Sequence, residues 1–434
     1  MQLVGTVAVI MCATLIASIL FKPNVTIKGL SVGTYWMVAL AGAVVLLLTQ
    51  SISLREVGAG LVASSAINPI KILVLFLSMT IQSIFLDEVG LFRYLANVTL
   101  KKAKGSQKTM FIYLYIIVSV LTVFTSNDII ILTFTPFICY FSKNAKINPI
   151  PYLFTEFVAA NTWSMALIIG NPTNVYLATA NDISFIQYMS VMLLPTVMGG
   201  CCAMLVLYLL FHKMLAQPLE CLEDDFRIED KGALVIGVAH LASCTVLLVV
   251  SSYIGLEMWL ITLCFAVSLF VTNGIYCLVK KKKTDILGRC LERAPWELIP
   301  FVISMFIFVM CFDKCNLTGV IENLLGEEQV VLRYGVVSFV VANLVNNIPM
   351  SVLFSSVVTS LDPQVLMDGV YASIVGSNIG AFFTPIGALA GIMWSGILKK
   401  NDVKMSFATY IKYGTIISVP TLLLSLAGLQ MVLN

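Results

Sequence analysis

The chain is organised as long apolar runs separated by short polar connections. A helix needs about 20 consecutive apolar residues to cross a bilayer, and several of the runs reach or approach this length. These runs lie at about 3–21, 34–50, 69–86, 185–211, 232–253, 256–279, 295–312 and 406–432. The pattern predicts an all-α polytopic membrane protein.

Four further apolar stretches are interrupted by polar residues, glycine or proline. They are 109–142, broken at 126–128; 153–183, broken at 170–174; 332–360, broken at 346–349; and 368–398, broken around 376–378 and 384–387. Lipid offers no hydrogen bonds to an interrupted backbone, so such breaks at membrane depth must be buried in protein or line a wet cavity. The breaks therefore predict discontinuous helices around a site near the middle of the bilayer.

The same order of features occurs twice along the chain. When Pro69 is placed on Pro295, Asp87 falls on Asp313 without a gap, and in both halves a stretch with an Asn-containing break and a second broken stretch follow. This self-similarity predicts an internal duplication. Its parts are an N-terminal half (1–211, with a repeat core at about 69–183), a connecting loop (212–231) and a C-terminal half (232–434, with a repeat core at about 295–398).

The charges of the loops predict that the two copies are inverted. Lysines flank the stretch that contains Asn127, at 101–108 and 143–146, whereas acidic residues flank the stretch that contains Asn347, at 327–328, 362 and 368. Because Lys and Arg mark cytoplasmic loops, the first pair of loops is expected inside and the second outside. Each stretch then enters and returns on one face as a re-entrant hairpin. We expect about ten full spans, two opposed hairpins and both termini outside, although the acidic loop 212–231 fits a cytoplasmic position less well.

Composition narrows the class of protein. Of the 434 residues, 59% are hydrophobic and 11% are charged, which suits lipid rather than water, and the net charge of +3 gives no indication of nucleic-acid binding. The sequence has no GxxxxGK[ST] motif, no evident catalytic cluster and too few histidines for a zinc site. We read most of the eleven cysteines as small apolar side chains, with contact to a soft metalloid as the alternative. The sequence thus predicts a solute carrier, not an enzyme, with no cofactor and no bound metal.

The breaks provide the candidate substrate site. Half-helix ends present unpaired N–H groups or carbonyls, and Asn, Ser and Thr side chains add neutral donors and acceptors. The alternative is that these side chains only cap helix ends. The candidate substrate-binding residues are Ser126, Asn127, Thr173, Asn174, Asn346, Asn347, Ser377, Asn378 and Thr384.

Asp128 is the only acid beside a hairpin break, and an ionisable group at membrane depth is costly unless it has a function or a partner. We predict that it carries the coupling ion, with helix capping or direct ligation as alternatives. Glu156 lies near the start of its span, where it faces either the membrane interface or the protein interior. Asp87 and Asp313 lie at the ends of apolar runs and are expected to be helix-end residues with a symmetric scaffold role.

Three motifs resemble the arsenite permease family, the arsenical pump membrane proteins of the ion transporter superfamily. They are NLVNNIP at 343–349, GSNIGAFFTPIGALAGIMW at 376–394 and SNDIIILTFTP at 126–136. The resemblance implies two inverted repeats with opposed hairpins in a prokaryotic plasma membrane. It also implies export of trivalent arsenite or antimonite, coupled to proton entry or to a soluble ATPase subunit, and it leaves a homodimer open.

Two features depart from that family. It carries an acid where this chain has Asn378, and GNPTN at 170–174 is closer to the G-x-P-x-N loops of sodium-coupled carboxylate carriers and sodium/proton antiporters. The alternatives are therefore a sodium- or proton-coupled carrier of small anions and a sodium/proton antiporter. A channel is a third class, but duplicated polar breaks favour alternating access over a continuous pore.

Overall fold

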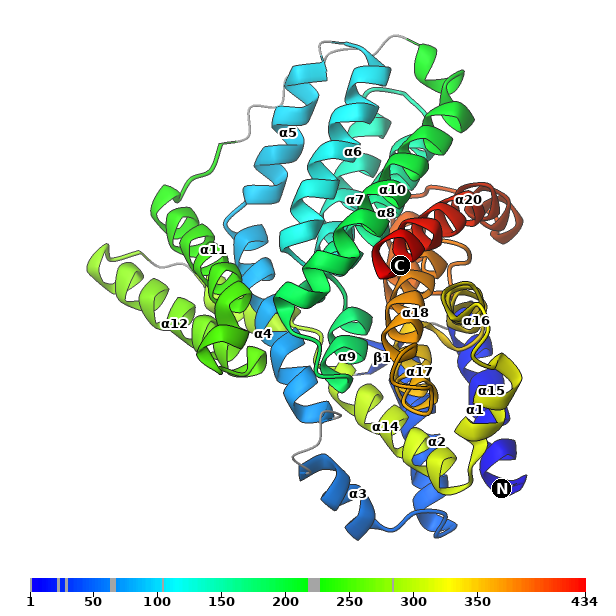
Figure 1. Cartoon of the computed structure of the whole chain (residues 1–434). Helices are drawn as coiled ribbons and strands as arrows, with labels where there is room; N and C mark the ends of the chain where they lie inside the picture. The colour runs from blue at the N-terminus through cyan, green and yellow to red at the C-terminus, as the bar shows by residue number, and fades with distance from the viewer. Residues whose placement is uncertain are drawn as a thin grey trace.

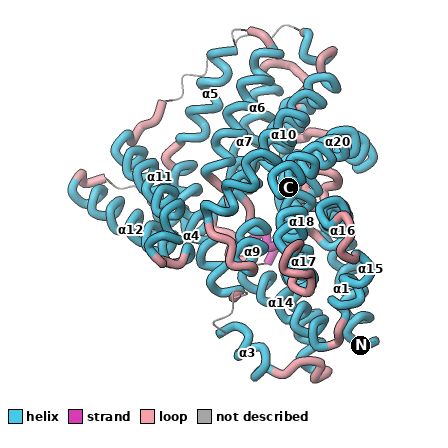
Figure 2. Tube along the Cα trace, viewed as in Figure 1, coloured by secondary structure: helices cyan, strands magenta, loops and turns pink. Residues whose placement is uncertain are grey.

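The computed structural model describes residues 2–21, 24–27, 30–62, 68–103, 105–217, 227–282 and 285–434. It is a bundle of helices with one short antiparallel sheet, in which β1 (Asn24–Ile27) pairs with β2 (Leu30–Gly33) and Val25 lies opposite Val32 (Figures 1 and 2). The prediction of an all-α chain therefore misses one hairpin. Its strands, NVTI and LSVG, contain the β-branched residues that favour extended backbone.

The remaining elements of the N-terminal half are helices. They are α1 (Gln2–Phe21), α2 (Tyr35–Leu48), α3 (Leu54–Val62), α4 (Pro69–Glu88), α5 (Leu91–Ala103), α6 (Gln107–Phe124), α7 (Asn127–Asn144), α8 (Ile150–Trp163), the 3-10 turns η1 (Ser164–Ala166) and η2 (Ile168–Gly170), α9 (Pro172–Ala180), α10 (Phe185–Phe211) and the turn η3 (Met214–Ala216).

The C-terminal half is also helical. It contains α11 (Lys231–Ile254), α12 (Met258–Val279), α13 (Ile286–Arg293), α14 (Leu298–Lys314), α15 (Leu317–Leu325), α16 (Val330–Val345), α17 (Asn347–Val358), α18 (Leu366–Gly380), α19 (Leu389–Lys400) and α20 (Phe407–Leu433).

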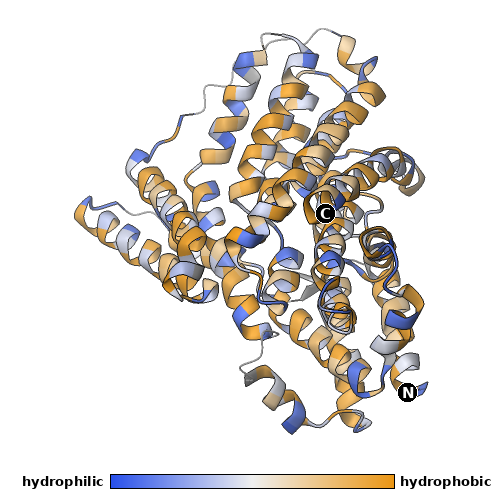
Figure 3. Cartoon of the chain, in the orientation of Figure 1, coloured by the Kyte–Doolittle hydropathy of each residue, from blue (hydrophilic) through white to orange (hydrophobic). Residues whose placement is uncertain are grey.

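Within the described ranges, seven helical segments are long and apolar enough to cross a membrane, and most helix surfaces are apolar (Figure 3). Shorter apolar helices at Gln2–Ser18, Tyr35–Leu48, Val330–Val345 and Asn347–Val358 accompany them. The chain is a multi-pass membrane protein. Helix α6 is among the seven, so length alone does not distinguish a full span from one limb of a hairpin, and the number of ten spans stays a prediction.

The two halves follow the same order of elements around the breaks. In each half a long helix (α4, α14) precedes a short one (α5, α15), a pair joined at an Asn-containing turn (α6–α7, α16–α17) and a broken helix (α8–α9, α18–α19). The helix that follows each break packs on the other half, α9 on α17 and α19 on α7. These exchanged contacts surround the site with segments from both halves (Figure 1). The inverted orientation of the halves stays a prediction.

Helices α16 and α18 approach each other unusually closely. A side chain at Gly376 of α18 would lie 2.0 Å from the Ser338 hydroxyl and 2.3 Å from the Gly335 carbonyl of α16. Only glycine fits such a contact between two backbones, as in the small-residue interfaces of membrane helices. This contact fixes one limb of the second Asn-containing helix pair against the broken helix beside it.

Ion pairs join the ends of the long helices to the short amphipathic helices of the opposite half. At the end of α4, Arg293 of α13 pairs with Asp87 at 2.6 Å and also with Glu88, which in turn pairs with Arg289 at 2.6 Å. At the end of α14, Lys314 pairs with Glu56 of α3 at 2.9 Å.

The aspartates Asp87 and Asp313 lie at matching positions, one residue before the ends of α4 and α14. Asp313 accepts a hydrogen bond at 3.2 Å from Ser356 of α17, which is the second limb of its hairpin. The Thr133 side chain of α7 lies beside Asp87, while its hydroxyl donates to the Ile129 carbonyl at 2.9 Å. Both residues are thus helix-end groups that contact a hairpin.

Candidate functional site

The first break lies between α6 and α7. Helix α6 ends at Phe124, Ser126 has an extended backbone, and α7 begins at Asn127. The side-chain amide of Asn127 donates to the side-chain oxygen of Asn161 in α8 at 3.0 Å, and the Asn127 side-chain oxygen accepts from the Asp128 backbone N–H at 2.9 Å. These bonds fix the beginning of α7 against the broken helix of its own half.

The second break lies between α16 and α17, where Asn346 adopts a φ of +78°. Its amide donates to the Ile386 carbonyl at 3.0 Å, and the Asn347 backbone N–H donates to the Gly387 carbonyl at 3.1 Å. Both acceptors belong to the connection between α18 and α19. The second hairpin is therefore held to the break of its own half, as the first hairpin is.

The break between α8 and α9 is a compact turn. The 3-10 turns η1 and η2 follow α8, and the Asn174 amide donates to the carbonyls of Ser164 at 2.8 Å and Leu167 at 3.2 Å. Gly170 is required here, because a side chain would lie 2.2 Å from the Ser164 carbonyl. The irregular backbone occupies 164–171, slightly earlier than the predicted 170–174, so Thr173 and Asn174 lie in the first turn of α9.

The prediction of a break at 376–378 is wrong. Helix α18 continues to Gly380, and the irregular segment is 381–388, so Ser377 and Asn378 are helical residues. The second half of α18 is buried in protein. Its polar side chains can therefore find partners on neighbouring helices, and the helix does not need to end there. Thr384 does lie in the irregular segment, but its hydroxyl and backbone N–H both donate to the Asn343 side-chain oxygen, at 2.7 and 3.1 Å.

Asn378 joins the two halves at the centre of the molecule. Its oxygen accepts from the Ser164 hydroxyl and the Asn171 amide, both at 3.0 Å. Its amide donates to the Asn174 oxygen at 2.7 Å and to the Ile374 carbonyl at 2.9 Å. All the hydrogen-bonding capacity of this buried side chain is used inside the protein, so Asn378 is a cross-link rather than an open ligand.

The candidate residues therefore divide into two groups. The side chains of Asn127, Asn174, Asn346, Asn378 and Thr384 have protein partners. Each of the other four candidate residues has a buried polar atom without a hydrogen-bond partner in the described structure, and these atoms are Ser126 Oγ, Thr173 Oγ1, Asn347 Oδ1 and Ser377 Oγ. Buried polar atoms are normally satisfied, so an unpaired group from each of the segments around the breaks is the kind of arrangement that a polar ligand completes.

Asp128 follows Asn127 in the first turn of α7 and is half-buried. Its backbone N–H is bonded, whereas no cation or hydrogen-bond donor contacts its carboxyl group among the residues that the structure describes. It is therefore not a side-chain cap, since a cap accepts a bond from a nearby backbone N–H. The carboxyl group remains available for a proton or another cation.

Sequence reasoning missed four residues of this network. Asn161, Ser164, Asn171 and Asn343 each supply a partner to a predicted site residue. Asn171 and Asn343 stood inside the motifs GNPTN and NLVNNIP and were detectable there. In the described ranges, no group of three His, Cys, Asp or Glu side chains is placed to hold a metal ion.

Three comparisons place the chain among known transporters. The profile of the family described as "CitMHS: Citrate transporter" matches residues 6–373. The arsenical pump membrane proteins of Escherichia coli and Yersinia enterocolitica are 24% and 25% identical over 377 and 382 residues, covering 83% of this chain and 86% of each relative. The crystal structure of the Alcanivorax borkumensis YdaH transporter, whose title reports an unusual topology, aligns with a TM-score of 0.54 at 13% identity over 100% of this chain and 97% of that one.

Proposed function

Because the chain belongs to the citrate transporter (CitMHS) family and is a membrane transporter similar to the arsenical pump membrane proteins, we propose that it exports arsenite or antimonite in exchange for protons. The observation that carries the substrate assignment is the set of unpaired, uncharged polar atoms at Ser126, Thr173, Asn347 and Ser377. The coupling assignment depends on Asp128.

The chemistry of the site suits a neutral, hydroxyl-bearing solute. Trivalent arsenite in its As(OH)3 form needs hydrogen bonds rather than a countercharge. The hydrogen bonds of the candidate residues run to Asn and Ser side chains and to backbone groups, and none in the described structure involves Lys or Arg. Free hydroxyl and amide oxygens at the ends of three broken segments can bind such a solute from several sides.

Thiol chemistry does not enter this proposal. The candidate residues include no cysteine, and the described cysteines form no metal-binding group with other ligand residues. The substrate would be held through its oxygen atoms, which allows release on the other side without breaking a strong sulfur bond. This property suits a carrier that must bind and release in each cycle.

Asp128 is the proposed coupling residue. Its carboxyl group has no cationic partner in the described structure, so a proton can neutralise it when the site closes around it. Sodium is the alternative coupling ion. A soluble ATPase subunit and a second copy of the chain are further partners that the family allows. In this proposal the transporter lies in the plasma membrane with both termini outside.

A second candidate function is proton- or sodium-coupled transport of a small anion, including a carboxylate. The helices α7, α9 and α17 all begin at the breaks, and helix N-termini attract anions through their unpaired N–H groups. The description of the matching family as a citrate transporter points the same way.

Purified protein in proteoliposomes decides between these candidates. Arsenite and citrate are each offered under an imposed pH gradient and under an imposed sodium gradient, and counterflow is measured without a gradient. We expect accumulation of arsenite driven by the pH gradient, and Asn347→Ala serves as the control with an impaired site. Accumulation of citrate but not arsenite would replace the first proposal by the second, and unsaturable flux of either solute would indicate a channel.

A further inference from the structure

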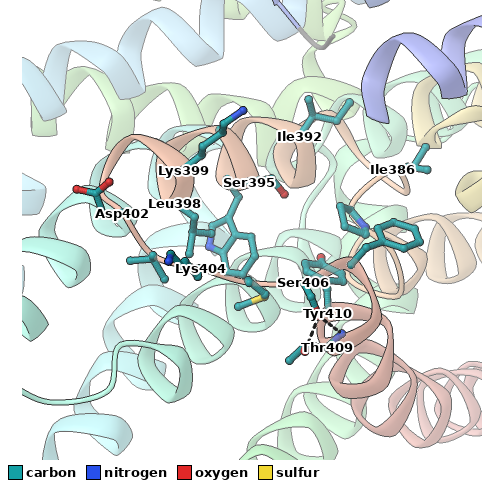
Figure 4. Close-up of a pocket in the computed structure, with 16 residues that line it drawn as sticks. Ile386, Ile392, Ser395, Leu398, Lys399, Asp402, Lys404, Ser406, Thr409 and Tyr410 are labelled. Atoms are coloured by element: carbon teal, nitrogen blue, oxygen red, sulfur yellow. Dashed lines mark hydrogen bonds between the residues drawn. The ribbon is translucent and has the colours of Figure 1, made fainter. Parts of the chain in front are cut away.

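A cavity of about 890 Å³ opens beside the connection between α19 and α20 (Figure 4). Lys399 at the end of α19, and Asp402 and Lys404 in this connection, line the cavity, and these lysines predict that the connection lies on the cytoplasmic face. Ile386, from the irregular segment that holds the second hairpin, also lines the cavity. The cavity thus leads from a predicted aqueous face toward the site.

The inner part of this cavity is aromatic. Trp394 and Tyr410 line it with their ring centroids 5.6 Å apart, and Trp394 packs at 5.0 Å on Phe157 of α8. The Tyr410 hydroxyl is buried without a hydrogen-bond partner in the described structure. The Trp394 indole N–H faces the carboxyl group of Glu156 without reaching hydrogen-bond geometry.

Glu156 precedes Phe157 in α8, so it lies behind the aromatic wall of the cavity. It is 0% exposed, and among the described residues the Thr135 hydroxyl of α7 is the one hydrogen-bond donor to it, 3.1 and 3.2 Å from its two oxygens. A carboxylate buried with one neutral donor is strongly disfavoured, whereas the protonated acid is not. The arrangement suits a group that is neutral when closed and ionises only when water reaches it.

The other helices packed on α8 supply no countercharge. Helix α7 presents Thr135 and the Cys139 thiol to Glu156, and α19 presents Trp394. Helices α6, α10, α18 and α20 and the turn η1 also pack on α8, and in the described structure none of them brings a charged side chain to Glu156. Whether Glu156 is protonated thus depends on whether water from the cavity reaches it, and not on a nearby charged side chain.

We propose that Glu156 is a second proton-binding site of the transporter, which exchanges its proton with the aqueous face through this cavity. The Tyr410 hydroxyl and the Trp394 N–H are the polar groups that a water molecule needs in order to bridge cavity and acid. Thr135 and Asp128 lie on the same helix, α7, so a movement of the first hairpin changes the surroundings of both acids together. This inference rests on the proposed proton coupling, but the proton site can be tested without any substrate.

The test is infrared difference spectroscopy of the purified full-length protein between pH 5 and pH 9, compared for the wild type, Glu156→Gln and Asp128→Asn. Gln keeps the shape and can still accept from Thr135, but it cannot titrate. We expect a titrating carboxylic acid band that persists in Asp128→Asn and is missing in Glu156→Gln. An unchanged spectrum in Glu156→Gln would overturn the proposal.

Transport then tests the role of this proton. In proteoliposomes, we expect Glu156→Gln to lose at least tenfold in pH-gradient-driven accumulation of arsenite while counterflow of arsenite without a gradient persists. Driven accumulation at the wild-type rate would overturn the coupling role. If the wild type carries no arsenite, the proposed substrate fails, whereas the infrared band still decides whether Glu156 binds a proton.

A second variant covers the case in which Glu156→Gln does not fold. Thr135→Val removes only the donor that favours the ionised form, so the Glu156 band should persist to higher pH than in the wild type. Thr133→Val, in which the hydroxyl donates to the Ile129 carbonyl of its own helix, is the matched control and should leave the band unchanged. Equal titration of the band in Thr135→Val and wild type would overturn the assignment.

Discussion

The two halves of the molecule share the neutral polar groups at their breaks but not the acids that lie near those breaks. Helix α7 begins at Asn127 and α17 at Asn347, so Asp128 corresponds to Ile348. Helices α8 and α18 end at Trp163 and Gly380, so that Asn161 corresponds to Asn378 and Glu156 to Ser373. The asparagines that hold the breaks are thus duplicated, whereas among the described residues these matched positions carry a carboxyl group in the first half alone. In our proposal, both halves therefore contribute neutral groups that bind substrate, whereas the first half contributes the acids that bind the coupling cation.

The peripheral ion pairs show a second difference between the halves. Among the described residues, Asp87 and Glu88 at the end of α4 pair with Arg289 and Arg293, whereas Lys314 at the end of α14 pairs with Glu56 alone. The α4 cluster is partly buried, and both partners of the α14 pair are largely exposed. Exposed single pairs contribute little. We therefore expect ion pairing to hold the end of α4 more firmly than the end of α14.

The largest effect concerns the relative orientation of the halves. In a cysteine-free background, Lys102→Cys and Lys146→Cys should react only with an impermeant reagent inside the cell, and Glu328→Cys and Asp362→Cys only with one outside. All four positions are exposed. This all-or-none pattern follows from the loop charges. Reaction of the cysteines at 102 and 146 from opposite faces would show that α6–α7 is not a hairpin.

The next effect tests the asymmetry of the acids. Asp128→Asn keeps the shape of the residue and removes its titration, so driven arsenite transport should fall by at least about 100-fold, as expected when one coupling group is lost. Counterflow without a gradient should continue. The measurement is uptake into proteoliposomes with and without a pH difference.

The matched control is Ile348→Asn at the corresponding position of α17, which should retain driven transport because no coupling group is removed. Driven transport at the wild-type rate in Asp128→Asn would remove this residue from coupling and leave Glu156 as the candidate. Equal losses in both variants would mean that the halves do not differ in the way proposed.

A smaller effect distinguishes the two hairpin asparagines. Asn347 Oδ1 is unpaired, so Asn347→Ala should weaken substrate binding by about 10- to 100-fold, the range for one lost buried hydrogen bond. The Asn127 amide is bonded to Asn161, so Asn127→Ala should lower thermal stability as well as transport. Substrate-dependent stabilisation and the apparent melting temperature in detergent measure the two effects.

Ser351→Ala is the control for Asn347→Ala, because the Ser351 hydroxyl donates only to backbone carbonyls of its own helix. It should leave substrate binding unchanged. If Asn127→Ala and Asn347→Ala bind arsenite as the wild type does, neither hairpin contributes to the site.

The smallest effect is expected at the exposed ion pair between Lys314 and Glu56. The hydrogen bond from Lys314, together with those from the Ser53 N–H and hydroxyl, lowers the pKa of Glu56 to about 2. The carboxylate is therefore ionised throughout pH 5.5 to 8, and its contribution is lost only as the pH falls through about 2 from the ordinary carboxyl range. Glu56→Gln should change the transport rate by less than about fivefold and leave the pH profile unchanged in shape. A shifted profile would mean that this pair takes part in coupling.

The sequence was most informative where a hydrogen-bonding requirement interrupts an apolar run. The turns at Ser126 and Asn346 lie where their patterns predict them, because a polar break at membrane depth has few structural solutions. The extent of α18 was less predictable. Ser377 and Asn378 read as a break, but a fully buried helix can satisfy polar side chains through a partner helix.

The partners of the polar residues were not predictable from the chain alone. Asn378 meets Asn171 and Asn174 although 207 and 204 positions of the chain separate them, and no local pattern encodes such a pairing. The same is true of Glu156 and Thr135, which lie on consecutive helices but are brought together by the packing of α7 on α8. Sequence identified residue types suited to a site, whereas the fold decides which of their atoms remain unpaired.

The cross-link at Asn378 has a consequence for how the transporter can move. Separating the halves at this point would leave several buried donors and acceptors without partners, at about 1–3 kcal/mol each. That cost makes the junction a fixed pivot, and neither half can slide along the other there during a cycle. Access would then alternate by tilting about the pivot, with the segments furthest from it travelling furthest and the asparagine junction remaining still.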